Sequence, residues 1–313
     1  MQQHQTEGTV ISSTGSWYEV STESGMLTCR IRGRLRLKGI RSTNPVVVGD
    51  RVMVEPDGDS SAIVEILPRH NYVIRRASNL SKESHIIAAN IDRALLIVTL
   101  HSPTTAREFV DRFLVTCEAY RVPVTIVLGK ADMLVGEYES EAEEFEAIYG
   151  DAGYDIIRLS STTGVGVEQI RELLRGCTTL VAGNSGVGKS SLVNAVAPEI
   201  AARVGEISKT HDTGMHTTTY TEMFEFMPGS YIVDTPGVKG FGTYDMEVEE
   251  ISHYFVEFFE LSKDCKYGNC THTHEPGCAV LAALERGEIA PSRYQSYLSM
   301  LEDKEEGKYR ASE

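Results

Sequence analysis

The chain has 313 residues, of which 41% are hydrophobic and 24% are charged, so it is an ordinary globular protein long enough for two or three domains. Its formal net charge of −15 excludes a protein that binds nucleic acid over most of its surface, because phosphates would be repelled. No apolar run approaches the roughly 20 residues of a membrane span. The polar N-terminus lacks the apolar segment of a signal peptide, and we therefore expect a cytoplasmic protein.

The first 70 residues show the pattern of a small all-β domain. Short apolar segments are separated by Gly, Ser, Asn or Asp turns, and about five strands in this length fit an OB-type barrel. The strands that the pattern places are 17–20, 27–37, 46–54 and 62–67.

A basic run begins on one of these strands. Its members are Arg30, Arg32, Arg34, Arg36, Lys38 and Arg41, with no acidic residue among them. The four even-numbered arginines alternate with apolar residues between Cys29 and Leu37, so the two sets face opposite sides of the strand. The arginines form either a solvated outer face or a stripe that binds the phosphates of RNA.

Residues 71–245 alternate between apolar strands and helical stretches, which is typical of an open, mostly parallel α/β sheet. The expected strands are 94–100, 124–128, 156–159, 178–182 and 231–233, and the expected helices are 107–120, 139–149, 166–174 and 189–196. Further helices are expected at 246–261, 279–286 and 292–302. The predicted domains are therefore a barrel at 1–70, an α/β domain at 71–245 and a helical domain at 246–313.

A phosphate-binding loop lies between an expected strand and an expected helix. Residues 183–190 match the pattern G-x-x-x-x-G-K-S in full, and its glycines let backbone N–H groups face the phosphates at a helix N-terminus. Lys189 is expected to bridge the β- and γ-phosphates, and Ser190 is expected to bind Mg²⁺. The expected phosphate-binding residues are Gly183, Asn184, Ser185, Gly186, Val187, Gly188, Lys189, Ser190 and Ser191.

Two further loops predict that the base is guanine. The segment Gly129-Lys130-Ala131-Asp132 ends a strand, and the Asp132 carboxylate can accept hydrogen bonds from both N1–H and the exocyclic amine of guanine. Adenine does not offer that pair of donors, so a buried carboxylate would oppose it. The loop that begins with Ser160 and Ser161 can offer a backbone N–H to the guanine carbonyl. Lys130, Asp132, Ser160 and Ser161 are the expected base-binding residues.

The remaining GTPase elements follow the phosphate loop. Asp234 ends another apolar strand and is expected to hold Mg²⁺, while the Gly237 N–H is expected to meet the γ-phosphate. One of Thr217 and Thr218 is expected to complete the Mg²⁺ shell when GTP is bound. The base-reading loops precede the phosphate loop in the chain, which indicates a circular permutation, since motifs at the carboxyl ends of adjacent strands tolerate a rearranged chain order.

A cysteine and histidine cluster lies in the expected helical domain. Cys265, Cys270, His272 and Cys278 supply three thiolates and one imidazole, which is a complete tetrahedral set for one structural Zn²⁺ without an open position. In a cytoplasmic chain such a cluster indicates a metal before disulfides. His274 is a rival ligand, and reduced free thiols are the alternative interpretation. The other cysteines, Cys29, Cys117 and Cys177, are expected in the core.

With these motifs in this order, the chain resembles, over nearly its whole length, the small-ribosomal-subunit-dependent GTPase A family, the bacterial circularly permuted GTPases that assist assembly of the small ribosomal subunit. The resemblance implies an N-terminal OB-type barrel, a permuted GTPase core and a C-terminal zinc-binding domain with the same zinc motif. It also implies weak intrinsic GTP hydrolysis, strong stimulation by the small (30S) subunit and a role in late maturation of that subunit. The expected partners are the subunit, its rRNA and GTP or GDP, with no membrane, and the chain is expected to be a monomer.

Two positions depart from common GTPase patterns. The family's base-reading motif begins with Asn where this chain has Gly129, which predicts weaker nucleotide affinity through the loss of one or two hydrogen bonds. Val238 stands where many GTPases place a water-orienting Gln, so hydrolysis by the protein alone is expected to be slow. His216, in a Gly-x-His-Thr-Thr segment that the family also carries, is the candidate catalytic residue. The alternative is a solvent-exposed loop histidine.

Two other functions stay open. One is a GTP-dependent RNA-binding chaperone whose hydrolysis is incidental. The other is a metabolic P-loop enzyme such as a kinase, which is disfavoured because no lid for an acceptor substrate is visible and because the base loops read guanine. Segment 237–242 runs directly into the C-terminal domain, which leads to the hypothesis that loss of the γ-phosphate shifts that domain.

Overall fold

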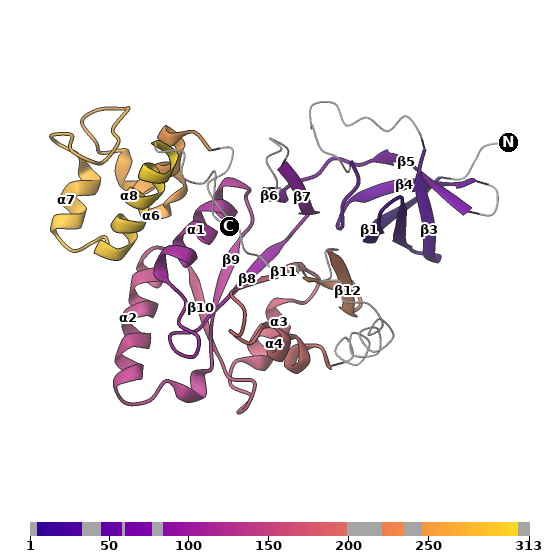
Figure 1. The fold of residues 1–313 in the computed structure, drawn as a ribbon, viewed down its shortest axis with the longest axis horizontal. Coiled ribbons are helices and arrows are strands. Elements are labelled where there is room, and N and C mark those ends of the chain that lie inside the picture. Colours follow the sequence, from indigo (N-terminus) through magenta and orange to yellow (C-terminus); the bar gives the residue numbers. More distant parts are fainter. Residues whose placement is uncertain are drawn as a thin grey trace. The chain divides into compact units, whose positions relative to one another are not determined.

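In a computed structural model, the protein is described for residues 5–32, 45–57, 60–76, 84–198, 221–234 and 246–305 (Figure 1). The chain divides into two compact units, each built from two distant stretches of sequence. The first unit is Met1–Leu95 with Gly166–Gly240, and the second is Leu96–Val165 with Phe241–Glu313. Within the described ranges, no helix is both long enough and apolar enough to cross a lipid bilayer.

The N-terminal stretch of the first unit forms a closed barrel, which confirms the predicted OB-type domain. Among the described residues the strand order is β1-β2-β3-β5-β4, and β1 also pairs with β4 (Figure 1). Its strands are β1 Thr6–Thr14, β2 Trp17–Thr22, β3 Gly25–Ile31, β4 Arg51–Asp57 and β5 Ser60–Ile66. Inward-facing residues alternate along these strands and form the barrel core: Val10, Tyr18, Val20, Cys29, Val46, Val52, Val54 and Ile63.

The strand predicted at 46–54 was wrong at its N-terminal end. The run of valines at 46–48 is buried but precedes β4, which begins only at Arg51. Between them Gly49 has a φ of +87°, and a Cβ there would lie 2.0 Å from the Ala89 carbonyl oxygen. Apolar character alone therefore did not distinguish a strand from this turn. β1 was missed because its sequence is largely polar and small.

Buried polar side chains join the barrel to the segment that follows it. Asn90 donates from Nδ2 to the Gly49 carbonyl oxygen at 2.9 Å, and its Oδ1 accepts from the His70 N–H at 3.0 Å. The Asp50 carboxylate, fully buried, accepts two hydrogen bonds from Arg69 at 2.6 and 2.7 Å. This segment contains a two-stranded sheet, β6 Tyr72–Arg76 and β7 Ser84–Ala89, that the sequence pattern had not indicated.

The rest of the first unit carries the phosphate-loop half of the α/β fold. Strands β11 and β13 are parallel, and β12 pairs with β13 in antiparallel fashion. The elements are α3 Val167–Leu173, β11 Thr178–Ala182, α4 Lys189–Val196, β12 Glu222–Met227 and β13 Ser230–Asp234. The predicted bounds of β11 and α4 are confirmed, whereas β12 was missed.

The second unit begins inside β8 Arg93–Val98 and carries the loops that are predicted to read the base. β8, β9 and β10 are neighbours in one sheet, with β9 and β10 parallel. The remaining elements here are α1 Arg107–Ala119, β9 Val124–Gly129, a 3-10 turn at Ala131–Met133, α2 Glu137–Asp151 and β10 Asp155–Leu159. Strands β8 and β9 are almost wholly buried, as expected for a sheet that is covered on both faces.

The C-terminal part of the second unit is helical, as predicted. Its elements are the 3-10 helix η2 Val248–Tyr254, α6 Val256–Ser262, α7 Ala279–Glu285 and α8 Pro291–Glu305. The single helix predicted at 246–261 is broken at Phe255, which has an extended backbone and is fully buried, stacked against Phe258. Its burial in the core that α6, α7 and α8 share explains the break.

Candidate functional site

The phosphate loop has the local structure that the motif requires. It leaves β11 at Ala182 and enters α4 at Lys189, and Gly183, Gly186 and Gly188 all have positive φ. These conformations are open to glycine and strained for other residues, so the pattern of glycines fixes the turn. The loop is therefore shaped to present its backbone to an anion at the start of a helix.

Lys189 lies folded over this loop. Its ammonium donates to the carbonyl oxygens of Gly183 and Asn184, both at 2.7 Å. Val187 is buried, while Ser190 and Ser191 are exposed on the first turn of α4. The predicted phosphate-binding residues 183–191 thus form one continuous turn, with the Lys189 ammonium folded back onto it.

Two of the predicted base-reading residues, Asp132 and Ser160, come together within the second unit. The Ser160 hydroxyl donates to Asp132 Oδ1 at 2.5 Å, although the two residues are 28 positions apart. Ser160 is buried and its Oγ accepts from the Thr163 N–H at 3.1 Å, so the loop after β10 fixes the Asp132 side chain. Asp132 and Ser161 are both exposed and accessible to a ligand.

Lys130 sits between Gly129, the last residue of β9, and Asp132. Its backbone is left-handed, with φ of 57° and ψ of 41°, and its ammonium donates to the carbonyl oxygen of Ser102. Ser102 belongs to the loop after β8, which contains none of the GTPase motifs. Nothing in a run of polar residues marks a backbone carbonyl as a lysine acceptor, so sequence inspection could not have found this contact.

Several predicted site residues lie outside what can be described. β13 ends at Asp234, as expected for the magnesium-binding aspartate, but its side chain is not described. His216, Thr217, Thr218 and Gly237 fall in the segments 199–220 and 235–245, which lie outside the described residues. Their roles stay predictions.

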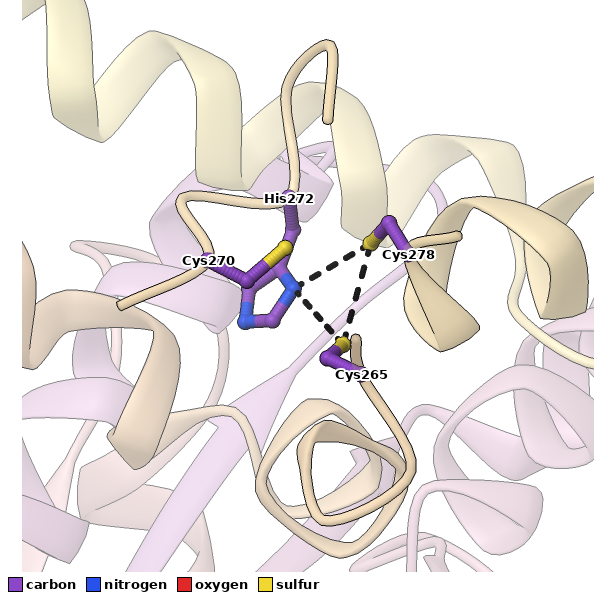
Figure 2. A group of neighbouring side chains, drawn as sticks. All are labelled: Cys265, Cys270, His272 and Cys278. Atoms are coloured by element: carbon purple, nitrogen blue, oxygen red, sulfur yellow. Dashed lines mark hydrogen bonds between the residues drawn. The ribbon is translucent and has the colours of Figure 1, made fainter. Parts of the chain in front are cut away.

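Four side chains in the C-terminal part converge as the sequence predicted (Figure 2). One ligand atom from each of Cys265, Cys270, His272 and Cys278 lies within 4.8 Å of all the others. His272 Nδ1 is 3.3 Å from Cys278 Sγ and 3.7 Å from Cys265 Sγ, and those two sulfurs are 3.9 Å apart. Ligands about 2.3 Å from a tetrahedral zinc ion lie roughly 3.7 Å from one another, so the cluster fits that ion.

The backbone around the cluster is held by its neighbours. The tyrosine hydroxyls of α8 donate to the loop, Tyr294 to the His272 carbonyl at 2.8 Å and Tyr297 to the Thr271 carbonyl at 2.7 Å. Backbone N–H groups of α7 point at the sulfurs, from Ala279 to Cys265 at 3.3 Å and from Leu281 to Cys278 at 3.4 Å. These contacts hold Cys265, His272 and Cys278 from outside, as the groups around metal ligands commonly do.

The rival ligand His274 is not part of this group. It is exposed, and its Nδ1 lies 2.8 Å from the hydroxyl of Thr273. Burial is the main cause that raises the pKa of Cys270 to about 12, and burial also raises the pKa of Cys278. Burial lowers the pKa of His272 and keeps its imidazole neutral. Burial thus favours the protonated thiols of Cys270 and Cys278, and a divalent metal would supply the positive charge that lets such thiols bind it as thiolates.

The described members of the basic run have partners. Arg30 and Arg32 are exposed and Cys29 is buried, which confirms the predicted alternation for this part of the strand. The guanidinium of Arg30 stacks 3.7 Å above the Trp17 ring on the neighbouring strand β2. Arg32 forms a 2.6 Å ion pair with Glu55 on β4, so an acidic residue from another strand partners this member of the run. Arg34, Arg36, Lys38 and Arg41 lie outside the described residues.

The phosphate loop between β11 and α4, with base-reading loops that precede it in the chain, defines a P-loop GTPase of circularly permuted order. Residues 66–244 match the family model of the RsgA GTPase, and residues 7–64 match that of the RsgA N-terminal domain. The chain belongs to the RsgA GTPase family and is a GTP hydrolase. The predicted fold class, enzyme class and family resemblance are confirmed.

Relatives and solved structures agree with this assignment. The chain is 55% identical over 308 residues to the small ribosomal subunit biogenesis GTPase RsgA of Bacteroides fragilis, covering 98% of this chain and 99% of that protein. It is 55% identical over 311 residues to the protein of the same name from Porphyromonas gingivalis, covering 97% and 99%. The crystal structure of YjeQ from Thermotoga maritima matches with a TM-score of 0.78 at 35% identity, covering 96% of this chain and 98% of that one. YloQ, described as a circularly permuted GTPase, matches with a TM-score of 0.74 at 28% identity, covering 99% and 97%.

Proposed function

We propose that the protein binds the small (30S) ribosomal subunit, assists its late maturation and hydrolyses GTP to GDP and phosphate under stimulation by that subunit. The observation that carries this proposal is the full-length similarity to relatives that are named for small-subunit biogenesis. We propose three domains along the chain, the barrel at 1–70, the GTPase domain at 71–245 and the helical domain at 246–313. A cytoplasmic monomer that contacts rRNA and no membrane fits this role.

The nucleotide is proposed to be GTP with Mg²⁺. Asp132, held by Ser160, reads N1–H and the exocyclic amine of guanine, while Lys130 and Ser161 complete the base site. Residues 183–191 and the Gly237 N–H bind the phosphates, with Lys189 exchanging its carbonyl partners for phosphate oxygens. Ser190, Asp234 and one of Thr217 and Thr218 would hold Mg²⁺, which neutralises charge on the phosphates during transfer.

The cysteine and histidine cluster is proposed to hold one structural Zn²⁺. The donor set of three sulfurs and one nitrogen and the spacing of the ligand atoms both support it. A fully ligated ion has no position for a substrate, so the site supplies folding energy and no reaction chemistry.

The barrel is proposed to contact rRNA through the basic run Arg30, Arg32, Arg34, Arg36, Lys38 and Arg41. Arg30 supports this, because a guanidinium stacked on Trp17 presents a flat cationic surface that suits an RNA base or phosphate. Arg32 contributes less, since its ion pair with Glu55 would have to exchange for a phosphate.

Hydrolysis is proposed to depend on His216. Val238 cannot hydrogen-bond the attacking water, so another group must position it. Replacing His216 with alanine is expected to leave GTP binding unchanged and to lower subunit-stimulated turnover by roughly 10²-fold or more. Nucleotide titrations and phosphate-release assays with saturating small subunits check this. The exposed His274 supplies the control substitution, and equal turnover in the mutant and the native protein would remove His216 from the mechanism.

GTP turnover titrated with purified small subunits tests the proposed function as a whole. Stimulation by small but not large subunits, with GTP and not ATP as substrate, is the expected result. If small subunits do not change the GTP turnover rate but RNA binding still depends on GTP, the alternative of a GTP-dependent RNA chaperone is favoured. Competition by ATP as strong as that by GTP would refute the base-reading role of Asp132.

A further inference from the structure

The loop that connects β8 to α1 is fixed by its own hydrogen bonds. In residues 99–105, the Thr105 N–H donates to the Thr99 carbonyl at 2.8 Å, and the Thr99 N–H donates to Thr105 Oγ1 at 3.1 Å. The Thr99 hydroxyl donates to the Pro103 carbonyl at 2.5 Å. Thr99 and Thr105 are buried, which leaves the tip residues His101 and Ser102 projecting from a closed base.

The tip of this loop is also tied to helix α2. The His101 ring lies 3.9 Å from the Tyr138 ring, centroid to centroid, and this ring contact is the main attachment, because His101 Nε2 lies 2.9 Å from Glu141 Oε2 without the angles of a hydrogen bond. Tyr138 and Glu141 occupy the first turns of α2, which begins a few residues after Asp132. The loop is therefore attached to the element that follows the base-reading motif.

Lys130 is held at both its side-chain and its backbone end. Its ammonium donates to the Ser102 carbonyl, and its left-handed backbone lies between buried β9 and the turn that carries Asp132. A lysine whose charged end is fixed in this way has a fixed methylene stem as well. A methylene stem fixed beside Asp132 offers an apolar surface against which the face of a purine base can pack.

We propose that loop 99–105 is a positioning element of the guanine site and that His101 is its key residue. Position 129 is glycine, so the bracing side chain that the family motif places there is missing. In this chain His101 holds the loop, the Ser102 carbonyl holds Lys130, and Lys130 supports the base that Asp132 reads. This inference rests on the proposed GTP-binding function and adds a residue to it from outside the five GTPase motifs.

A double-mutant cycle tests this chain of contacts. The variants are His101→Ala, Lys130→Met, which keeps most of the stem and loses the ammonium, and the two combined. Equilibrium titration with a fluorescent guanine nucleotide gives the Kd for GTP and GDP. Lys130→Met is expected to raise the Kd about tenfold, the size expected for loss of one charge-assisted hydrogen bond. His101→Ala is expected to raise it severalfold, but only while Lys130 is present.

Matched variants keep the result interpretable. Lys263→Met removes an exposed lysine paired with Glu260 and should leave the Kd unchanged. His101→Phe keeps a ring against Tyr138 and should restore part of the affinity lost in His101→Ala. Gly129→Asn restores a brace at the first position of the motif, so His101→Ala should cost less in that background.

The outcomes separate this inference from the function on which it rests. If the native protein fails to bind GTP, the proposed function fails. A second outcome is that the native protein binds GTP and that both His101→Ala and His101→Phe bind GTP with the Kd of the native protein. In that case the proposed function stands and the positioning role of His101 is refuted. If His101→Ala weakens binding by the same factor in the native background and in the Lys130→Met background, His101 acts only through general stability, and the proposal is overturned.

Discussion

Replacing Cys278 with serine is expected to abolish zinc binding and to unfold segment 263–278. Cys278 Sγ is one of four ligand atoms that lie within 4.8 Å of one another. Binding of a structural zinc ion contributes about 10–16 kcal/mol in small zinc domains at neutral pH, so loss of one ligand removes the main stabilisation of this loop. A serine oxygen still caps α7, where Cys278 Sγ now accepts from the Leu281 N–H. The substitution therefore removes a metal ligand while it keeps the N-terminal cap of α7.

The unfolding is expected to stay local, because the surrounding helices have a core of their own. The buried members of that core are Val115, Met246, Ile251, Phe255, Phe258, Cys278, Val280, Ala283, Ile289, Tyr297 and Met300. Apart from Cys278 these residues are not metal ligands, and most of them belong to α1, η2, α6, α7 and α8. Loss of zinc should leave α1 and α8 folded and should free the Tyr294 and Tyr297 hydroxyls from the loop carbonyls.

Metal analysis and hydrogen exchange followed by mass spectrometry check this prediction. The native protein should contain one zinc ion per chain and Cys278→Ser none, and peptides from 263–278 should exchange much faster in the variant. Cys177→Ser, at a half-buried thiol outside the cluster, should change neither quantity. Unchanged exchange in 263–278 after chelation would show that the loop does not need a metal.

Local sequence signals predicted the phosphate loop and the metal cluster well. At the phosphate loop, an apolar strand, glycines and a helical pattern follow one another, and the predicted bounds of β11 and α4 agree with the structure. The metal ligands lie within one short segment, so their spacing alone brings them together. In both cases the residues that form the motif are close in sequence, so local backbone geometry is enough to predict that they lie together.

Contacts between distant residues were not predictable in the same way. The acidic partner of Arg32 is Glu55, 23 positions later on another strand of the barrel, and the acceptor of Lys130 is a backbone carbonyl 28 positions earlier. The strand β1, which is polar and built largely of small residues, is recognisable only through its pairing with β2 and β4. These features depend on which elements become neighbours, which a single sequence does not specify.

A buried charge cluster joins the C-terminal helices to α1, and none of its members drew notice in the sequence. Arg293 on α8 is 1% exposed and forms ion pairs with Asp111 on α1 at 2.8 Å and with Glu257 on α6 at 2.7 Å. Phe255 and Tyr149 surround its guanidinium, with ring centroids at 4.8 and 5.7 Å. Although burial opposes its charge, Glu257 and Asp111 raise the pKa of Arg293, so it stays protonated.

This cluster constrains the hypothesis that the γ-phosphate moves the C-terminal domain. α1 belongs to the GTPase part of the second unit, and α8 belongs to the helical C-terminal part. Any displacement of the C-terminal helices must either carry α1 along or separate Arg293 from Asp111 in a buried environment. Because the second course leaves charges unpaired, a shift that includes α1 is the less costly of the two.

Replacing Arg293 with methionine is therefore expected to destabilise the second unit by about 3–5 kcal/mol, because it leaves the fully buried carboxylate of Asp111 and the half-buried carboxylate of Glu257 without a cation. Arg286→Met is the control, since Arg286 is exposed beside Glu288 and its loss removes only a solvated surface pair. Native-state hydrogen exchange in α1 and α8 measures the difference. Equal protection in the two variants would show that the cluster does not hold these helices together.

The pH dependence of the stability of the Arg293→Met variant tests whether unpaired carboxylates cause its destabilisation. Burial already raises the pKa of Asp111 against the opposing influence of Arg293, and removal of the arginine should raise it further. A carboxyl group whose pKa is higher in the folded state destabilises the fold above its unfolded pKa of about 3.9, and that penalty disappears as the group is protonated. The stability gap between variant and native protein should therefore narrow as the pH falls from about 7 toward about 4. Adding Asp111→Asn and Glu257→Gln to Arg293→Met should recover much of the lost stability at neutral pH. If the difference in stability does not depend on pH and is not reduced by these two substitutions, lost packing and not unpaired charge is its cause.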